Sequence, residues 1–94
     1  MKVSIKLASN LASLTENNKN IDYELSSRAT INRLIDLLDQ QFPGFKSVIC
    51  TEQREIADHI NLYVNGDNIL YLGGLDVELK EGDTINVIPA AAAG

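Results

Sequence analysis

The chain has 94 residues, of which 45% are hydrophobic, and a formal net charge of −5 at pH 7. This length is enough for one small domain with a single modest core, and the hydrophobic content excludes a disordered chain. Thirteen acidic residues against eight basic ones, with no cluster of Lys and Arg, argue against a nucleic-acid-binding surface and against binding to an anionic membrane. A basic protein partner is compatible with this charge.

The single cysteine, Cys50, excludes a disulfide within the chain. The N-terminus lacks the charged start and the apolar run of a signal peptide, and no segment approaches the ~20 apolar residues of a membrane span. We therefore expect a cytoplasmic protein in a reducing environment.

Hydrophobic and polar residues alternate near the N-terminus. Residues 3–7 follow this two-residue period and predict a half-buried first strand. Residues 11–20 are mostly polar and small, with a turn-like segment at residues 16–20. Residues 21–25 alternate again and predict a second strand. If the two strands form a hairpin, lysines of the first can face acidic residues of the second, which is mildly favourable across a strand pair.

A helix is predicted next. Thr30 is a suitable N-cap, because its hydroxyl can accept a hydrogen bond from a backbone N–H that has no partner within the helix. Hydrophobic residues then recur at helical spacing, and Pro43-Gly44 ends the pattern. The hydrophobic positions are Ile31, Leu34, Ile35, Leu38 and Phe42.

The segments after the helix are shorter. Residues 45–50 are apolar and predict either a strand or a turn of helix, and residues 51–58 are charged and loop-like. Residues 60–64 alternate between apolar and polar side chains and predict a strand. The sequence Asn65-Gly66-Asp67 predicts a turn at its end.

Alternation returns at residues 75–79 and 85–87, and a turn is predicted between them at residues 80–83. The run Leu70, Tyr71 and Leu72 cannot face entirely inward on a two-residue period. Either it forms a patch for a partner, or it is a tightly coiled segment that packs on the core.

The order of the predicted elements is strand, strand, helix and then further strands. One helix must cover one face of the sheet, which gives a two-layer α+β architecture. A hairpin followed by a helix that crosses over to a strand beside the first strand makes a β-grasp, or ubiquitin-like, mixed sheet. We expect this domain to span residues 1–89 and a flexible tail to span residues 90–94.

The C-terminus is the most informative part of the sequence. Pro89 cannot donate a ladder hydrogen bond and is a natural end to the last strand. The five small residues after it would reach about 17 Å if extended, and none has a side chain able to do chemistry. One interpretation is that the carboxylate of Gly94 is the reactive group and is handled inside another protein's active site. The other is an ordinary frayed terminus.

The remaining candidate groups have structural explanations. Cys50 lies in an apolar segment, where a buried and unreactive thiol is expected. His59 has no second His or Cys at metal-ligand spacing, and Asp36 and Asp39 are expected to be solvated on the polar helix face. Gly73-Gly74 fits a tight turn better than a phosphate-binding loop. We therefore expect neither an enzyme nor a bound metal or cofactor.

Four segments of the second half occur in an order typical of one family. They are Tyr63-Val64-Asn65-Gly66-Asp67-Asn68-Ile69, Leu72-Gly73-Gly74-Leu75-Asp76, Leu79-Lys80-Glu81-Gly82-Asp83 and Ile88-Pro89-Ala90. With the helix, its Phe-Pro-Gly stop and the small tail, they resemble the MoaD/ThiS sulfur-carrier family over essentially the whole chain. The resemblance is closest to longer MoaD-like members, which include carriers of cysteine biosynthesis and archaeal ubiquitin-like modifiers.

This resemblance implies that Gly94 is the reacting group. In the family, a ubiquitin-activating-like adenylyltransferase uses ATP to convert the terminal carboxylate into an acyl-adenylate, and sulfur then replaces the adenylate to give a thiocarboxylate. A synthase, such as a molybdopterin synthase large subunit, takes the sulfur for molybdopterin, thiamine, cysteine or another metabolite. The residues carried over as partner-binding are Pro89, Ala90, Ala91, Ala92, Ala93 and Gly94.

One position departs from the family, which usually ends in Gly-Gly where this chain has Ala93-Gly94. An additional methyl group can clash in a channel fitted to glycine. Three explanations are open: the partner's channel is wider, the chain has lost a final residue, or the carrier no longer works. Two other functions share the same features, namely a modifier that joins Gly94 to lysines of other proteins and a β-grasp interaction module with an inert tail.

Overall fold

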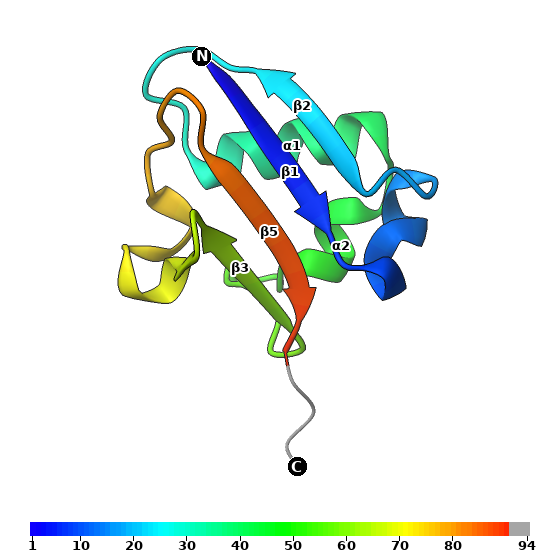
Figure 1. Ribbon diagram of the computed structural model, residues 1–94. Coiled ribbons are helices and arrows are strands. Elements are labelled where there is room, and N and C mark those ends of the chain that lie inside the picture. Colours follow the sequence, from blue (N-terminus) through cyan, green and yellow to red (C-terminus); the bar gives the residue numbers. More distant parts are fainter. Residues whose placement is uncertain (91–94) are drawn as a thin grey trace.

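The computed structural model describes residues 1–90. Its centre is a five-stranded mixed sheet in the order β2-β1-β5-β3-β4 (Figure 1). The strands are β1 (Lys2–Leu7), β2 (Asn20–Glu24), β3 (Ile60–Val64), β4 (Asp67–Asn68) and β5 (Thr84–Pro89). The α-helices are α1 (Ile31–Gln41) and α2 (Phe45–Ile49), and the short 3-10 helices are η1 (Ser9–Thr15), η2 (Ile69–Tyr71) and η3 (Gly74–Asp76).

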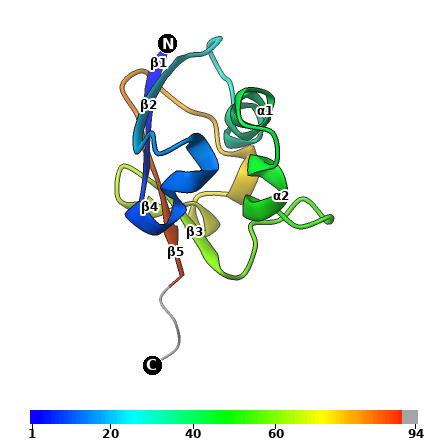
Figure 2. The ribbon, with the colours of Figure 1, turned by 90° about the vertical axis from the view of Figure 1, so that its right-hand side faces the viewer.

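The topology is the one expected from the sequence. β1 and β2 form an antiparallel hairpin, and β5 runs parallel to β1 on its other side and antiparallel to β3. Both α-helices lie on the same side of the sheet, which Figure 2 shows nearly edge-on. A hairpin, a crossover helix and a last strand beside the first define the β-grasp fold, so the predicted α+β, ubiquitin-like fold class is confirmed.

The core lies between the sheet and α1. Alternate side chains of a strand point to opposite faces, so each central strand sends every second residue toward the helix. The buried strand residues are Val3, Ile5, Leu7, Ile60, Leu62, Val64, Ile85 and Val87. They meet the buried face of α1, which consists of Ile31, Leu34, Ile35 and Leu38. On the outer face, Lys2 Nζ lies 3.5 Å from the carboxylate of Asp22, so the expected pairing of opposite charges across the hairpin is present.

The start and end of α1 agree with the sequence. The Thr30 hydroxyl accepts a hydrogen bond from the backbone N–H of Arg33 at 3.3 Å, as an N-cap does. The helix ends before Pro43-Gly44, where Gly44 has a φ of 97° that favours glycine. No helix within residues 1–90 has the length and apolar character to cross a bilayer.

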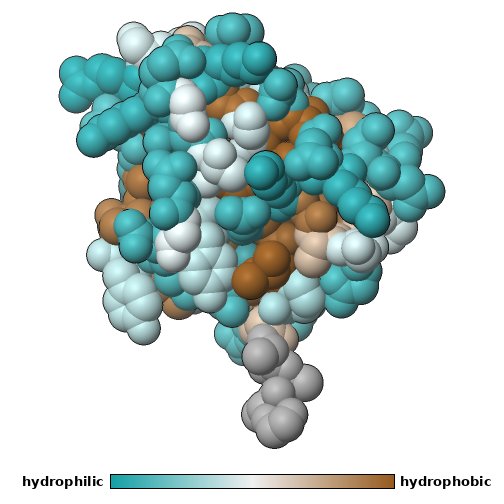
Figure 3. Space-filling model, viewed as in Figure 1, coloured by the Kyte–Doolittle hydropathy of each residue, from teal (hydrophilic) through white to brown (hydrophobic). Residues whose placement is uncertain are grey.

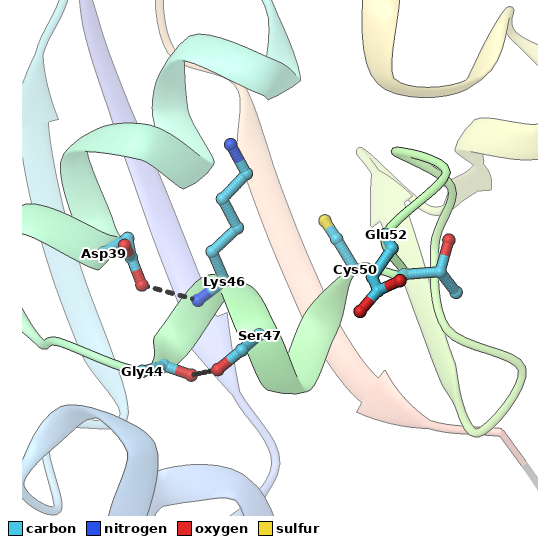
Figure 4. A pocket seen from close by; sticks show the side chains of 7 residues that line it. Asp39, Gly44, Lys46, Ser47, Cys50 and Glu52 are labelled. Carbon is cyan, nitrogen blue, oxygen red and sulfur yellow. Dashed lines mark hydrogen bonds between the residues drawn. The ribbon is translucent and has the colours of Figure 1, made fainter.

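Of the two alternatives for residues 45–50, the structure has the helix: Phe45–Ile49 form α2, and Cys50 makes an isolated bridge to Ile56. Asp39 Oδ1 accepts a hydrogen bond from the backbone N–H of Lys46 at 2.9 Å (Figure 4). Asp36 Oδ1 lies 2.8 Å from Lys46 Nζ. Both carboxylates are partly exposed on the polar face of α1, as expected, but they also bind Lys46. They connect α1 to α2, and a carboxylate beside the first turn of a helix satisfies a backbone N–H that has no partner in the helix.

Two other segments differ from the expectation. Residues 75–79 alternate but form no strand, because the chain turns through η3 and then makes only an isolated bridge between Thr30 and Glu78. Leu75 and Leu79 are nevertheless buried. The polar and small residues after β1 form η1 instead of a simple loop, and the Thr15 hydroxyl donates to the carbonyl of Asn18 at 2.7 Å.

Asp83 joins the turn before β5 to the end of β3, and its loss is expected to destabilise the fold. Its buried carboxylate accepts hydrogen bonds from Asn65 Nδ2 and from the backbone N–H of Lys80, both at 2.8 Å. Because Asp83→Ala leaves these donors without their acceptor, we expect the free energy of unfolding to fall by about 1.5–3 kcal/mol in urea denaturation. Asp67→Ala removes an exposed carboxylate and serves as the control. Equal losses in both variants would contradict this account.

Candidate functional site

The candidate site begins where β5 leaves the sheet. β5 is the central strand and is paired on both sides, with Val87 opposite Leu7 of β1 and Pro89 opposite Ile60 of β3. Figure 1 shows that β5 ends at the opposite end of the domain from the N-terminus. The course of the chain up to the end of β5 is therefore fixed by two neighbouring strands.

A proline fits at position 89 because it has no N–H to donate, and no strand lies on that side to accept one. Backbone groups of successive strand residues face opposite neighbours. The carbonyl of Val87 accepts from Ala8 on the β1 side at 3.1 Å, and the N–H of Ala90 donates to His59 on the β3 side at 2.9 Å. The nitrogen of Pro89 therefore faces the β1 side, where β1 has already ended at Leu7.

The structure places two of the predicted site residues. Pro89 is the last residue of β5 and Ala90 makes one further hydrogen bond, and both side chains are half-buried. The prediction that Ala91, Ala92, Ala93 and Gly94 form a reactive tail lies outside the described residues. The predicted boundary between domain and tail at Pro89 likewise stays a prediction, although hydrogen bonding with β3 extends to Ala90.

The only cysteine does not contribute a reactive thiol. Cys50 is buried and borders a shallow pocket beside α2 together with Lys46 and Glu52 (Figure 4). Burial raises the pKa of the Cys50 thiol and the charge of Asp36 adds to this effect, whereas Lys46 lowers it. Because the thiolate is the nucleophilic form, this environment opposes reactivity, as the sequence suggested.

Cys50 is accordingly expected to react slowly with alkylating reagents. At pH 8 the folded protein should be modified by iodoacetamide at least about tenfold more slowly than the urea-unfolded chain, because both burial and the raised pKa disfavour attack. Mass spectrometry of quenched samples follows the reaction. Equal rates for the folded and unfolded chains would show that the thiol is accessible.

Other sites of chemistry are not seen in the described part of the chain. His59 is exposed just before β3, and residues 1–90 hold no group of three or more His, Cys, Asp or Glu side chains that could bind a metal.

The sequence left two explanations for the apolar run at residues 70–72. Leu70, Tyr71 and Leu72 are all exposed, so we call these three residues the η2 patch.

Comparison with known proteins agrees with the fold. The sequence matches the ThiS family over residues 5–94. The chain belongs to the ThiS family. A candidate sulfur carrier protein of Archaeoglobus fulgidus is 32% identical over 94 residues, and the match covers 100% of both chains. The predicted MoaD/ThiS relationship is therefore confirmed at the level of the family.

Two further relatives extend the comparison. Small archaeal modifier protein 3 of Haloferax volcanii is 28% identical over 76 residues, which cover 81% of this chain and 82% of the relative. The crystal structure of the Amycolatopsis orientalis BexX/CysO complex contains a chain that is 32% identical, with a TM-score of 0.83 over 98% of this chain and 99% of that one. Members of the ThiS family similar to this chain are thus small carrier and modifier proteins rather than enzymes, and one of them is solved with a partner.

Proposed function

We propose that this chain is a sulfur carrier whose C-terminal Gly94 is converted to a thiocarboxylate. The observation that carries the proposal is the end of β5, where a strand paired on both sides leads straight into a segment without functional side chains. The match to the ThiS family includes this segment, since it extends to residue 94. A rigid domain with a narrow terminal segment suits a protein that is the substrate of other enzymes.

The chemistry requires an activating partner. A C-terminal carboxylate is ionised at neutral pH and is a poor acyl donor. In an adenylyltransferase, a carboxylate oxygen of Gly94 attacks the α-phosphorus of ATP and pyrophosphate leaves. The sulfur of a sulfide donor then attacks the acyl carbon, AMP leaves, and the thiocarboxylate remains. A synthase uses this sulfur as a nucleophile, and hydrolysis returns the carboxylate.

The chain itself supplies direction and shape. Pro89 lies opposite Ile60 of β3 and Ala90 donates to the carbonyl of His59, so the point on the domain from which the tail starts is fixed. Alanine and glycine add little bulk, which allows Ala91, Ala92 and Ala93 to enter a narrow channel. No metal or cofactor of the chain's own takes part in this scheme.

The proposal is tested by intact mass after incubation with ATP, a sulfide source and the adenylyltransferase of the same cell. We expect a mass gain equal to the exchange of one oxygen for one sulfur. A chain lacking Gly94 is the control and should show no gain. If the full chain also shows none with any cognate adenylyltransferase, the β-grasp interaction module with an inert tail becomes the better explanation.

A second experiment identifies the pathway that receives the sulfur. The thiocarboxylate form is incubated separately with a molybdopterin synthase large subunit and its precursor, and with a synthase that makes cysteine from an activated serine derivative. Sulfur should appear in one of the two products. The segments that resemble longer MoaD-like members, which include carriers of cysteine biosynthesis, are compatible with both arms.

A second function is favoured by one relative, the small archaeal modifier protein. A modifier would use the same adenylate but join Gly94 to lysines through an isopeptide bond. A blot of cell lysate against an epitope tag at the N-terminus distinguishes the two functions. High-mass conjugates that disappear with Gly94 deleted would support the modifier, and their absence during both growth and stress would oppose it.

A further inference from the structure

The η2 patch leaves hydrophobic surface outside the core. Leu70, Tyr71 and Leu72 are 66%, 89% and 44% exposed, whereas Ile69 beside them is fully buried. Figure 3 shows hydrophobic surface at the left edge of the molecule, where this segment lies, among hydrophilic residues. Exposed apolar area is unfavourable in water, and a contiguous stretch of it marks an interaction site.

The patch is held in one conformation. Ile69 anchors the start of η2 in the core and Leu75 anchors the chain behind it. The Asn68 side chain accepts a hydrogen bond from the N–H of Leu70 at 2.9 Å, and the N–H of Leu72 donates to Ile69 at 2.9 Å. Because the backbone of this segment is already fixed, binding of a partner costs little of the segment's conformational entropy.

Acidic side chains surround the patch. Asp67 and Asp76 are exposed and share surface hollows with Leu72, and Asp58 shares one with Leu70. Glu78 lies on the same side but pairs with Arg28 at 3.0 Å. The cations lining these hollows are Arg54 and Lys80. The rim is therefore net negative, and it disfavours a second copy of this chain because acid would face acid.

Recognition by the activating enzyme needs a surface of this kind. The tail offers only methyl groups and a carboxylate, and every protein in the cell has a C-terminal carboxylate. We propose that the η2 patch is the surface by which the adenylating enzyme selects this chain, and that it enters an apolar pocket bordered by Lys and Arg. This assignment rests on the proposed function and adds the part of the domain that the enzyme contacts.

The test compares variants in steady-state pyrophosphate release by the cognate adenylyltransferase, with ATP and the full chain. Leu70→Ser with Tyr71→Ser should raise the KM for the chain by about tenfold or more and leave kcat unchanged, because binding is lost while the tail still reacts. Both side chains are mostly exposed, so the thermal midpoint should stay the same. Higher ionic strength should raise the KM of the unmodified chain.

A charge-matched pair tests the acidic rim. Asp67→Lys lies beside the patch and should raise the KM several-fold, whereas Glu52→Lys makes the same change in charge at an exposed position near α2 and should not. An unchanged KM in the double variant overturns the assignment. So does a loss of binding confined to the sulfur-accepting synthase, or a dimer of the unmodified chain that light scattering shows to be lost in the double variant. Absence of pyrophosphate release with the unmodified chain rejects the proposed function, and this assignment with it.

Discussion

Replacing Ala92 by phenylalanine is expected to lower the kcat/KM of C-terminal activation by about 100-fold. The proposed function requires the tail to enter a narrow channel, and a displacement of the reacting carboxylate by about 1 Å costs a factor of this size. Pyrophosphate release by the adenylyltransferase measures the effect. The thermal midpoint should not change, because the core and the hydrogen bonds described above lie within residues 1–90.

Two smaller substitutions serve as controls for Ala92→Phe. Ala92→Gly removes bulk and should react like the unmodified chain. Ala93→Gly restores the Gly-Gly ending that is usual in the family, and it should react at least as well. If the phenylalanine variant is activated at a normal rate, the tail does not enter a narrow channel, and another explanation is needed for its run of small residues.

The largest expected effect on stability comes from Phe45→Ala. Phe45 is 1% exposed and is among the largest fully buried side chains, at the start of α2. Its truncation should lower the free energy of unfolding by about 3–5 kcal/mol, through lost burial and the cavity left behind. Small domains have a total stability of about 5–15 kcal/mol, so a substantial fraction should be lost. Urea denaturation followed by circular dichroism measures it.

Tyr71→Ala is the matched control for Phe45→Ala, because it truncates an aromatic side chain that is 89% exposed. Its free energy of unfolding should change by less than about 0.5 kcal/mol. Similar losses in both variants would mean that Tyr71 packs against the domain in solution. That result would also remove the basis for the η2 patch.

The sequence predicted best those elements in which one local signal coincides with burial. In β1, β3 and β5, the alternation of hydrophobic and polar residues has a clear start or stop. In α1, the hydrophobic spacing begins at the Thr30 cap. Residues 75–79 show the limit of this reasoning. The alternation correctly indicates that Leu75 and Leu79 face the core. A strand also needs a neighbouring strand with which to form hydrogen bonds, and β4 ends after two residues.

For the candidate site and its surroundings, too, some features could be predicted from the sequence and others could not. Pro89 was predictable because a proline has few positions in a sheet. The role of Asp36 and Asp39 was missed because Lys46 comes to them only when α2 folds back on α1. For residues 70–72, the sequence was equally compatible with a patch for a partner and with a coiled segment packed on the core. The choice depended on where the chain turns after Asn68, which alternation does not encode.

The central position of β5 also determines how the domain responds to mechanical force. Tension applied at the C-terminus acts along β5 and loads its hydrogen bonds to β1 and β3 in shear, so these bonds must break together. An edge strand would instead peel away one bond at a time. An unfolding machine that pulls on the tail therefore meets the most highly connected strand first, and an enzyme can grip and release the tail without unravelling the domain.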